Sequence, residues 1–305
     1  MSASLALCFP GQGSQAAGMA GGLDDGPMAA ELLGVATSEG LDLAAALRGD
    51  DAALRPTEVA QPALLFVEAV LAAELAGGVA VAAVAGHSVG EYAACVFAGA
   101  IAPADAMRLV IARGRAMASM REGAMSAILG LDEATLADVC AEVSASGTKV
   151  VVANLNAPGQ TVISGTVAGV EAAEALAQQR GARRAVRLNV SGAFHSPLMA
   201  DAAERLSAVL DAVAIERARL PIVANVDATP VTEPDAIRDR LRRQLTAPVR
   251  WVDCVNRLIE MGATTLVEVG PSNVLSGLSR RIAPAAVTLQ VATSEAAHGL
   301  VVTAQ

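Results

Sequence analysis

A serine lies in a glycine-bounded turn that follows an apolar segment. Residues 86–90 read Gly-His-Ser-Val-Gly and fit the pattern G-x-S-x-G, and residues 79–85 before them are apolar. Between a strand and a helix this pattern is typical of a nucleophile elbow, in which glycines relieve a strained turn and the serine hydroxyl projects above the sheet. The turn therefore predicts that Ser88 is a nucleophile and that the backbone N–H of Val89 stabilises an oxyanion. The alternative is a glycine-rich turn without chemistry.

A serine hydroxyl needs a base, and the chain has three histidines. His298 is close to the C-terminus, where a surface histidine is expected. His87 is adjacent to the serine, and neighbouring side chains in an extended turn point apart, so we expect His87 to pack or to shape the pocket. His195 lies between a predicted strand and a predicted helix, where sites of α/β proteins form. We predict that His195 is the base; the alternative is a capping or surface histidine.

The third member of a hydrolase triad is not apparent. No acidic residue between Ser88 and His195 ends a predicted strand, and Glu268, which lies late in a strand, follows the histidine. The pattern therefore predicts a Ser–His dyad whose imidazole is oriented by a backbone carbonyl.

Alternating strands and helices must position these residues. Short apolar runs predict strands at 4–9, 79–85, 222–225, 264–269 and 286–291. The segments between them predict helices at 61–77, 89–97, 103–120, 197–213, 235–245, 250–261 and 273–282. Aromatic residues make up only 2% of the chain, which suits parallel strands buried on both faces by alanine-rich helices.

The middle of the chain follows a different pattern. Between residues 125 and 189 the predicted order is strand, helix, strand, strand, helix, strand, which is the order of a ferredoxin-like unit. We therefore predict an α/β fold with an inserted subdomain. Its parallel-sheet, α/β-hydrolase-like catalytic core is formed by residues 1–123 and 191–305, and residues 124–190 form the ferredoxin-like subdomain.

Composition narrows the functional classes. The net charge is −9 with a single lysine, which is a poor basis for nucleic-acid binding. Four widely spaced cysteines and three histidines show no metal-ligand spacing, so we expect no metal site and buried free thiols in a reducing compartment. The N-terminus lacks the basic region of a signal peptide, and no apolar run is long enough to span a membrane. A cytoplasmic protein that binds no membrane is expected.

Six short segments form a set of motifs that occurs in order along nearly the whole chain. They are 9–15 (FPGQGSQ), 86–91 (GHSVGE), 113–117 (RGRAM), 156–165 (NAPGQTVISG), 194–199 (FHSPLM) and 244–251 (QLTAPVRW). These motifs resemble those of one enzyme family, the malonyl-CoA:acyl carrier protein transacylases, free-standing acyltransferases of fatty-acid and polyketide synthesis. Together they are specific, although each alone is weak.

This resemblance implies a role for individual residues. Ser88 would carry the malonyl group as an ester and His195 would be its base. The backbone N–H groups of Gln12 and Val89 would bind the oxyanion. The backbone carbonyl of Gln244 would orient His195, and Arg113 would pair with the free carboxylate of malonate.

The chemistry of the acyl group agrees with the role implied for Arg113. Malonyl differs from acetyl by one carboxylate, which a planar guanidinium binds with two parallel hydrogen bonds. The helical spacing alone does not separate Arg113 from the other arginines of its helix.

Phe194, before the histidine, resembles the malonyl-using version of its motif and would narrow the space beside the α-carbon of the acyl group. Gly192 favours a free-standing enzyme over a modular synthase.

The expected substrates are malonyl-CoA and the phosphopantetheine thiol of holo acyl carrier protein, with a ping-pong mechanism, no cofactor and a monomeric enzyme. Because carrier proteins are acidic, docking would need a local basic patch. Candidates are clusters at Arg180–Arg187, Arg238–Arg243 and Arg280–Arg281.

The alternative functions are an acyltransferase dedicated to a polyketide pathway, the transacylase subunit of malonate decarboxylase, a serine thioester hydrolase, and a non-catalytic binding module. Residues 16–50 match no family motif.

Overall fold

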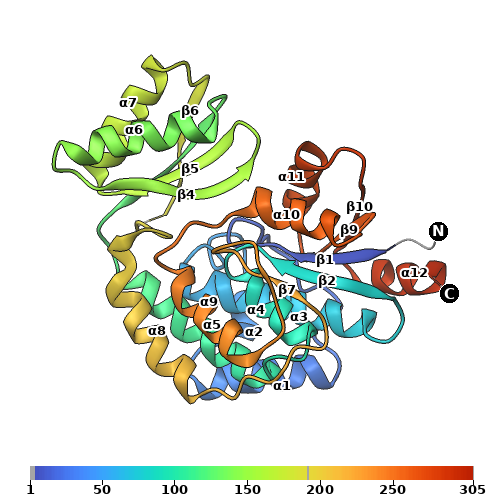
Figure 1. Ribbon diagram of the computed structural model, residues 1–305. Helices are drawn as coiled ribbons and strands as arrows, with labels where there is room; N and C mark the ends of the chain where they lie inside the picture. Colours follow the sequence, from blue (N-terminus) through green and yellow to red (C-terminus); the bar gives the residue numbers. More distant parts are fainter. Residues whose placement is uncertain (1–3, 191, 305) are drawn as a thin grey trace.

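Two β-sheets organise the chain, and the smaller is inserted between strands of the larger (Figure 1). The computed structural model describes residues 4–190 and 192–304. The large sheet has the strand order β10-β9-β1-β2-β7-β8, and its neighbouring strands are parallel except for the pair β7 and β8. Its strands are β1 (Leu5–Phe9), β2 (Val81–Gly86), β7 (Ile222–Val223), β8 (Pro230–Val231), β9 (Thr265–Val269) and β10 (Val287–Val291).

Helices cover both faces of the large sheet because its central strands are apolar on both sides. Along β1, Leu5, Leu7 and Phe9 pack into one hydrophobic cluster, and Ala6 and Cys8 pack into another. The first cluster includes residues of α1 (Pro27–Ser38), α2 (Leu43–Arg48), α3 (Thr57–Leu75), α4 (Gly90–Phe97), α5 (Pro103–Ala118), α8 (Ala200–Ala212) and α9 (Pro234–Gln244). The second includes residues of α10 (Trp251–Glu260) and α11 (Val274–Ile282), and α12 (Ser294–Ala304) packs against α3.

The small sheet is antiparallel, with the order β4-β5-β3-β6. Its elements are β3 (Ala124–Leu129), α6 (Glu133–Ala145), β4 (Val150–Ala157), β5 (Gln160–Gly165), α7 (Val167–Gln179) and β6 (Arg184–Arg187). The structure thus confirms an α/β fold with a parallel core sheet and a second sheet inserted into it. Residues 1, 191 and 305, which bound the predicted domains, lie outside the described residues, and the exact division stays a prediction.

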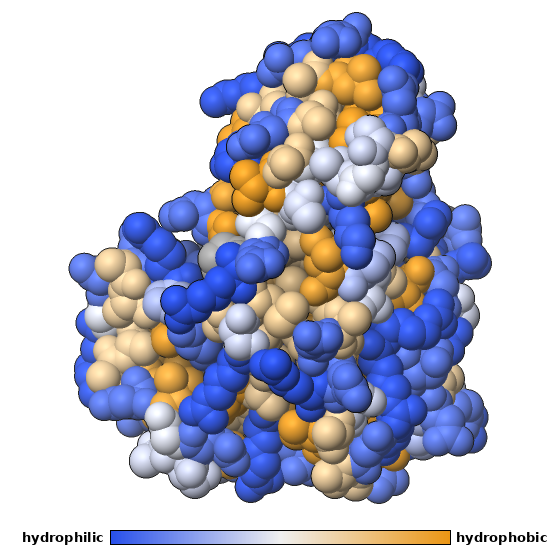
Figure 2. All heavy atoms as spheres, turned by 90° about the vertical axis from the view of Figure 1, so that its left-hand side faces the viewer, coloured by the Kyte–Doolittle hydropathy of each residue, from blue (hydrophilic) through white to orange (hydrophobic). Residues whose placement is uncertain are grey.

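The small sheet contacts the core through β4. The backbone N–H of Leu155 donates to the Val249 carbonyl at 2.9 Å, and the Val249 N–H donates to the Ala153 carbonyl at 2.8 Å. Arg281 of α11 donates to the Pro158 carbonyl at 2.7 Å. The small unit stands as a narrower lobe on the core, and apolar side chains gather on it and near the junction (Figure 2).

Several elements differ from the predictions. Helix α3 begins at Thr57, not at residue 61, because Pro56 and Thr57 already enter the first turn and Pro62 is accommodated inside the helix. Helices α1, α2 and α12 and strand β8 were not predicted, and β7 is shorter than expected. A two-residue strand such as β8 depends on its partner and has no periodicity of its own.

Two sequence expectations concern the whole chain. All four cysteines are free and buried, which confirms the prediction of free thiols. In the described part of the chain, no helix is long and apolar enough to cross a membrane.

Candidate active site

Ser88 sits in a sharp turn between β2 and α4. Its φ is 54°, a left-handed conformation that is uncommon for a residue with a side chain. The turn is packed so closely that a Cβ on Gly90 would lie 2.2 Å from the Phe9 carbonyl oxygen. Asn225 fixes the turn: its side-chain oxygen accepts from the Ser88 N–H at 2.7 Å, and its Nδ2 donates to the Gly86 carbonyl at 2.6 Å. The sequence at 86–90 therefore forms the elbow that its glycines predicted.

The loop after β1 lies directly on the elbow. The His87 N–H donates to the Phe9 carbonyl at 2.8 Å, and a Cβ on Gly11 would lie 2.6 Å from the His87 carbonyl oxygen. This contact brings Gln12 into the cavity that Ser88 lines. Within residues 4–190 and 192–304, neither the Gln12 N–H nor the Val89 N–H makes a hydrogen bond, so both remain available to an oxyanion.

Ser88 and His195 are in direct contact. Ser88 Oγ lies 2.8 Å from His195 Nε2, and His195 Nδ1 lies 3.0 Å from the Gln244 carbonyl oxygen. Because a carbonyl only accepts, Nδ1 carries the proton and Nε2 is free to accept from the serine hydroxyl. Burial, then the nearby positive charge of Arg113, lowers the pKa of His195 to about 3. The imidazole is therefore a neutral base at physiological pH.

Arg113 is buried beside the nucleophile, unlike Arg108 and Arg115 on the same helix, which are exposed. Its NH2 group donates to Ser88 Oγ at 3.0 Å and to the side-chain oxygen of Gln244 at 2.9 Å. Its NH1 group donates to the side-chain oxygen of Gln61 at 2.7 Å. The helical spacing could not separate these arginines, whereas the motif match selected the one that faces the serine.

Gln244 connects several parts of the site. Its Nε2 donates to the Ser88 carbonyl at 2.9 Å and contacts a carboxylate oxygen of Glu91. Burial raises the pKa of Glu91 to about 7, against the opposing effects of the Gln244 hydrogen bond and the Arg113 charge. The predicted contribution of Gln244 was its backbone carbonyl alone. In the structure, its side chain also joins the elbow, Arg113 and Glu91.

The small sheet completes a cavity of about 150 Å³ over these groups. The core contributes the reactive residues, and the inserted unit contributes polar and apolar side chains that cover them. The lining residues are Gln12, His87, Ser88, Arg113, Met117, Phe194 and His195 from the core, and Met125, Asn154, Asn156, Val162, Leu188 and Val190 from the inserted segment.

Three further residues considered from the sequence are His87, Phe194 and His298. His87 Nε2 is 2.8 Å from the side-chain oxygen of Asn156, and its ring packs 5.5 Å from that of Trp251. His87 thus lines the cavity and does not contact the serine hydroxyl. Phe194 also lines the cavity, and His298 is exposed on α12.

Some residues at the site were not singled out from the sequence. Asn225 lies two residues after β7, and a polar residue just beyond the carboxyl end of a parallel strand is a signal that could have identified it. Gln61 lies inside an apolar helix, where only the structure reveals that it faces Arg113. Glu268, the acid considered as a triad member, accepts from Ser276 and Ser272 instead. The described residues hold no His, Cys, Asp and Glu group suited to a metal.

Comparison with known proteins agrees with this geometry. A family model described as "Acyl transferase domain" matches residues 7–292. The malonyl CoA-acyl carrier protein transacylase of Bacillus subtilis is 45% identical, covering 95% of this chain and 94% of that protein. A structure of the transacylase from Coxiella burnetii has a TM-score of 0.92 and 38% identity, covering 99% and 98% of the two chains.

A further solved structure includes a protein partner. It is described as a type II PKS acyl-carrier protein in complex with its malonyl-transacylase, with a TM-score of 0.91, 38% identity, and coverage of 99% of this chain and 98% of that one. These matches extend over almost the whole length of both proteins in each pair. The chain belongs to the acyl transferase domain family, among the malonyl CoA-acyl carrier protein transacylases.

Proposed function

We propose that this enzyme transfers the malonyl group of malonyl-CoA to the phosphopantetheine thiol of holo acyl carrier protein through a malonyl ester on Ser88. The observation that carries the proposal is the buried guanidinium of Arg113, 3.0 Å from the nucleophile. A guanidinium group beside Ser88 Oγ, the atom that is acylated, favours an acyl group with a free carboxylate. An acetyl group would leave that buried donor without its partner.

Each half-reaction uses the same groups. Ser88 Oγ attacks the thioester carbonyl as its proton passes to His195 Nε2, and the N–H groups of Gln12 and Val89 stabilise the oxyanion. The tetrahedral intermediate collapses, the C–S bond breaks, and the imidazolium returns the proton to the CoA sulfur. In the second half-reaction the carrier thiol gives its proton to His195 and attacks the ester, and Ser88 regains its proton.

Acylation also changes the partners of Arg113. In the free enzyme its NH2 group donates to the Ser88 hydroxyl oxygen. An ester oxygen is a weaker acceptor than a hydroxyl, so the malonyl-enzyme releases this donor to the malonyl carboxylate. Arg113 also donates to the side-chain oxygens of Gln61 and Gln244, and these two hydrogen bonds keep the orientation of its guanidinium group after acylation. Arg113 therefore serves the nucleophile before acylation and the substrate after it.

The proposal extends to the architecture. The parallel sheet with a strand–elbow–helix supports an α/β-hydrolase-like core formed by 1–123 and 191–305, and the strand order β4-β5-β3-β6 supports a ferredoxin-like subdomain at 124–190. We propose no cofactor, because every proton and acyl transfer uses side chains or substrate. The monomeric state, the cytoplasmic location and the lack of nucleic-acid or membrane binding stay predictions.

The arginine clusters differ in how far they are neutralised. Arg240, Arg242 and Arg243 of the second cluster pair with aspartates. Arg180 and Arg187 of the first cluster pair with glutamates. In the described ranges no carboxylate pairs with the rest, which are Arg183, Arg184, Arg238, Arg280 and Arg281. Arg238 is half-buried and donates to the carbonyls of Leu210 and Val213. These unpaired charges support a carrier-protein surface that includes the first and third clusters.

A second candidate is the same reaction in a polyketide pathway. One similar structure holds a type II PKS acyl-carrier protein, which supports this candidate. Comparing transfer rates to a fatty-acid and a polyketide carrier protein would distinguish the pathways.

Intact-protein mass spectrometry tests the main proposal. Mixing with malonyl-CoA should add one malonyl group, and adding holo acyl carrier protein should move it to the carrier. Ser88→Ala should show no adduct. Arg113→Ala should raise acetyl relative to malonyl acylation by about two orders of magnitude, whereas the exposed Arg115→Ala should not. An adduct on Ser88→Ala, or one lost to water before the carrier is added, would contradict a serine-linked transferase.

A further inference from the structure

A second hollow adjoins the site cavity. It has a volume of about 510 Å³ and shares two lining residues, Gln12 and Val190, with the cavity over Ser88. The two spaces therefore meet at the residue expected to bind the oxyanion. We call this hollow the Arg55–Arg121 groove; its other lining residues are Ala52, Pro56, Thr57, Glu58, Ala118 and Asn189.

The groove carries two cations without partners. Arg55 and Arg121 are both exposed, and in the part of the chain that is described neither forms an ion pair or a side-chain hydrogen bond. Most other surface arginines differ: Arg108, Arg180 and Arg250, for example, each pair with a carboxylate. One carboxylate, Glu58, also lines the groove, so the net charge of the two arginines and Glu58 is +1.

A hydrogen bond between two side chains links the groove to the reacting centre. Gln12 Nε2 donates to Thr57 Oγ1 at 2.9 Å. Arg55 lies two residues before Thr57, a span of at most about 7 Å of extended chain. Arg55 and Arg121 thus line a groove that borders the cavity over Ser88 at Gln12 and Val190. A long, thin substrate with its thioester at Ser88 and its anionic end in the groove fits this arrangement.

We propose that the Arg55–Arg121 groove binds the phosphate end of the phosphopantetheine arm that carries the thioester. This inference rests on the proposed function, because only a pantetheine thioester joins a reactive carbonyl to a distant phosphate. Guanidinium groups bind phosphate oxygens through charge-assisted hydrogen bonds. Both CoA and the carrier protein present such a phosphate, so the same arginines serve in both half-reactions.

Paired thioesters test the proposal. In Arg55→Gln and Arg121→Gln, the KM for malonyl-CoA should rise about tenfold each, with little change in kcat, because the phosphate contact acts in binding. The malonyl thioester of N-acetylcysteamine has no phosphate, and its kcat/KM should stay at the wild-type value in both variants.

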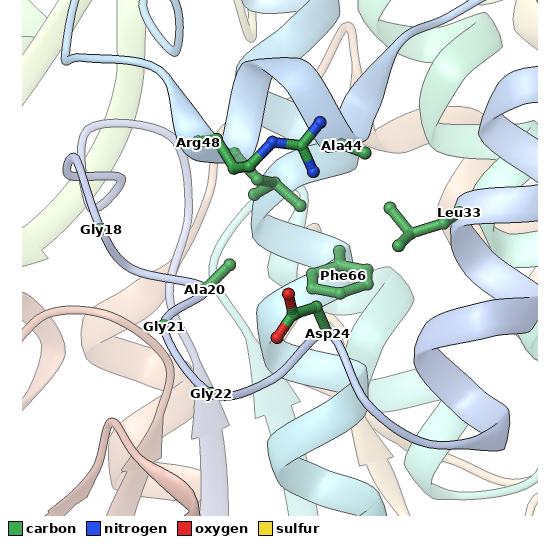
Figure 3. A pocket seen from close by; sticks show the side chains of 10 residues that line it. Gly18, Ala20, Gly21, Gly22, Asp24, Leu33, Ala44, Arg48 and Phe66 are labelled. Atoms are coloured by element: carbon green, nitrogen blue, oxygen red, sulfur yellow. The ribbon is translucent and has the colours of Figure 1, made fainter.

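A third cavity provides a matched control. It has a volume of about 270 Å³ and is lined by the exposed Arg48, with Asp24 on its opposite side and Phe66 between them (Figure 3). Among the described residues, none lines both this cavity and the one over Ser88. Arg48→Gln removes one surface charge and should leave the KM for malonyl-CoA unchanged.

The outcomes distinguish a failure of the groove proposal from a failure of the proposed function. A KM increase confined to the phosphate-bearing thioester, or to holo acyl carrier protein, supports the groove as a phosphate site. Equal losses with both thioesters, or no change in either variant, would overturn it. If wild-type enzyme is not acylated by the phosphate-free thioester or by malonyl-CoA, the function itself fails, whatever the arginine variants do.

Discussion

At the residue scale, His195 and Arg113 influence each other because both are buried next to Ser88. Burial lowers the pKa of both groups, and the charge of Arg113 lowers that of His195 further. The arginine therefore favours the neutral imidazole that accepts the serine proton. Once a malonyl carboxylate neutralises the charge of Arg113, that charge no longer destabilises the protonated form of His195, so the imidazolium formed during transfer is more stable.

This coupling predicts the pH dependence of acylation. The active form is neutral His195, which is present above its pKa of about 3 and is lost as the pH falls through that value. The kcat/KM for malonyl-CoA should therefore stay flat from pH 8 to about pH 5, measured in rapid single-turnover reactions. In Arg113→Ala the acid limb of the pH profile should move to higher pH, because the positive charge that helps to lower the pKa of His195 is gone. Because Glu91 in the same site has a pKa of about 7, a limb near pH 6.5 would contradict a buried neutral base only if Glu91→Gln leaves it in place.

The sequence predicted residues that belong to local motifs better than those that act through tertiary contacts. Ser88, Val89 and the elbow followed from a five-residue pattern. Gln244 and Arg113 needed the family resemblance, since no local pattern shows that distant helices converge on one serine. Gln61 was missed because a single buried amide in an apolar helix gives no periodic signal, and Asn225 was missed although its place after a parallel strand could have identified it.

At the element scale, the elbow depends on a residue that follows the neighbouring strand. Asn225, two residues after β7, accepts from the Ser88 N–H and donates to the Gly86 carbonyl, and Ser88 stays left-handed between these contacts. The side chain of Asn225 is fully buried. A parallel neighbour thus restrains the turn that presents the nucleophile.

Removing that restraint should affect both stability and rate. Asn225→Ala leaves the buried Gly86 carbonyl and the half-buried Ser88 N–H without their partner, and an unpaired buried polar group costs about 1–3 kcal/mol. We expect a loss of about 2–4 kcal/mol in the free energy of unfolding, measured in urea, and a slower acylation of Ser88 in the folded fraction. Asn256→Ala, at an exposed position on α10, is the control. Unchanged stability and acylation in Asn225→Ala would show that the elbow holds without it.

The order of elements was easier to predict than their lengths. Apolar runs identified the central strands β1, β2 and β9, since these are buried on both faces. The inserted unit followed from its alternation of strands and helices. The helices within residues 16–50 were missed because alanine and glycine there give little contrast between a buried and an exposed face.

At the scale of the whole molecule, buried ionisable groups make stability depend on pH. Glu68 on α3 is fully buried, and neither of its carboxylate oxygens has a partner among the residues described. Burial, then the charge of Glu268, raises the pKa of Glu68 well above its usual value. The folded state thus keeps a proton that the unfolded chain releases above its pKa near 4.3. The contribution of Glu68 to stability is complete below that pH and is lost as the pH rises.

Glu68→Gln tests this contribution. The amide cannot ionise, so the fall in Tm between pH 6 and pH 8 should be smaller than in the wild type. Glu31→Gln, at an exposed position on α1, should leave the pH dependence unchanged. Parallel pH profiles for the wild type and Glu68→Gln would mean that Glu68 is ionised in the folded protein.

The position of β1 has a consequence for synthesis on the ribosome. Of the strands of the large sheet, β1 is synthesised first, and it lies between β2 and β9, which begins only at Thr265. During translation one edge of β1 stays unpaired until residues 265–269 have been made. Strand β9 therefore completes the pairing of β1, and a nascent chain released before β9 would expose an apolar edge prone to aggregation.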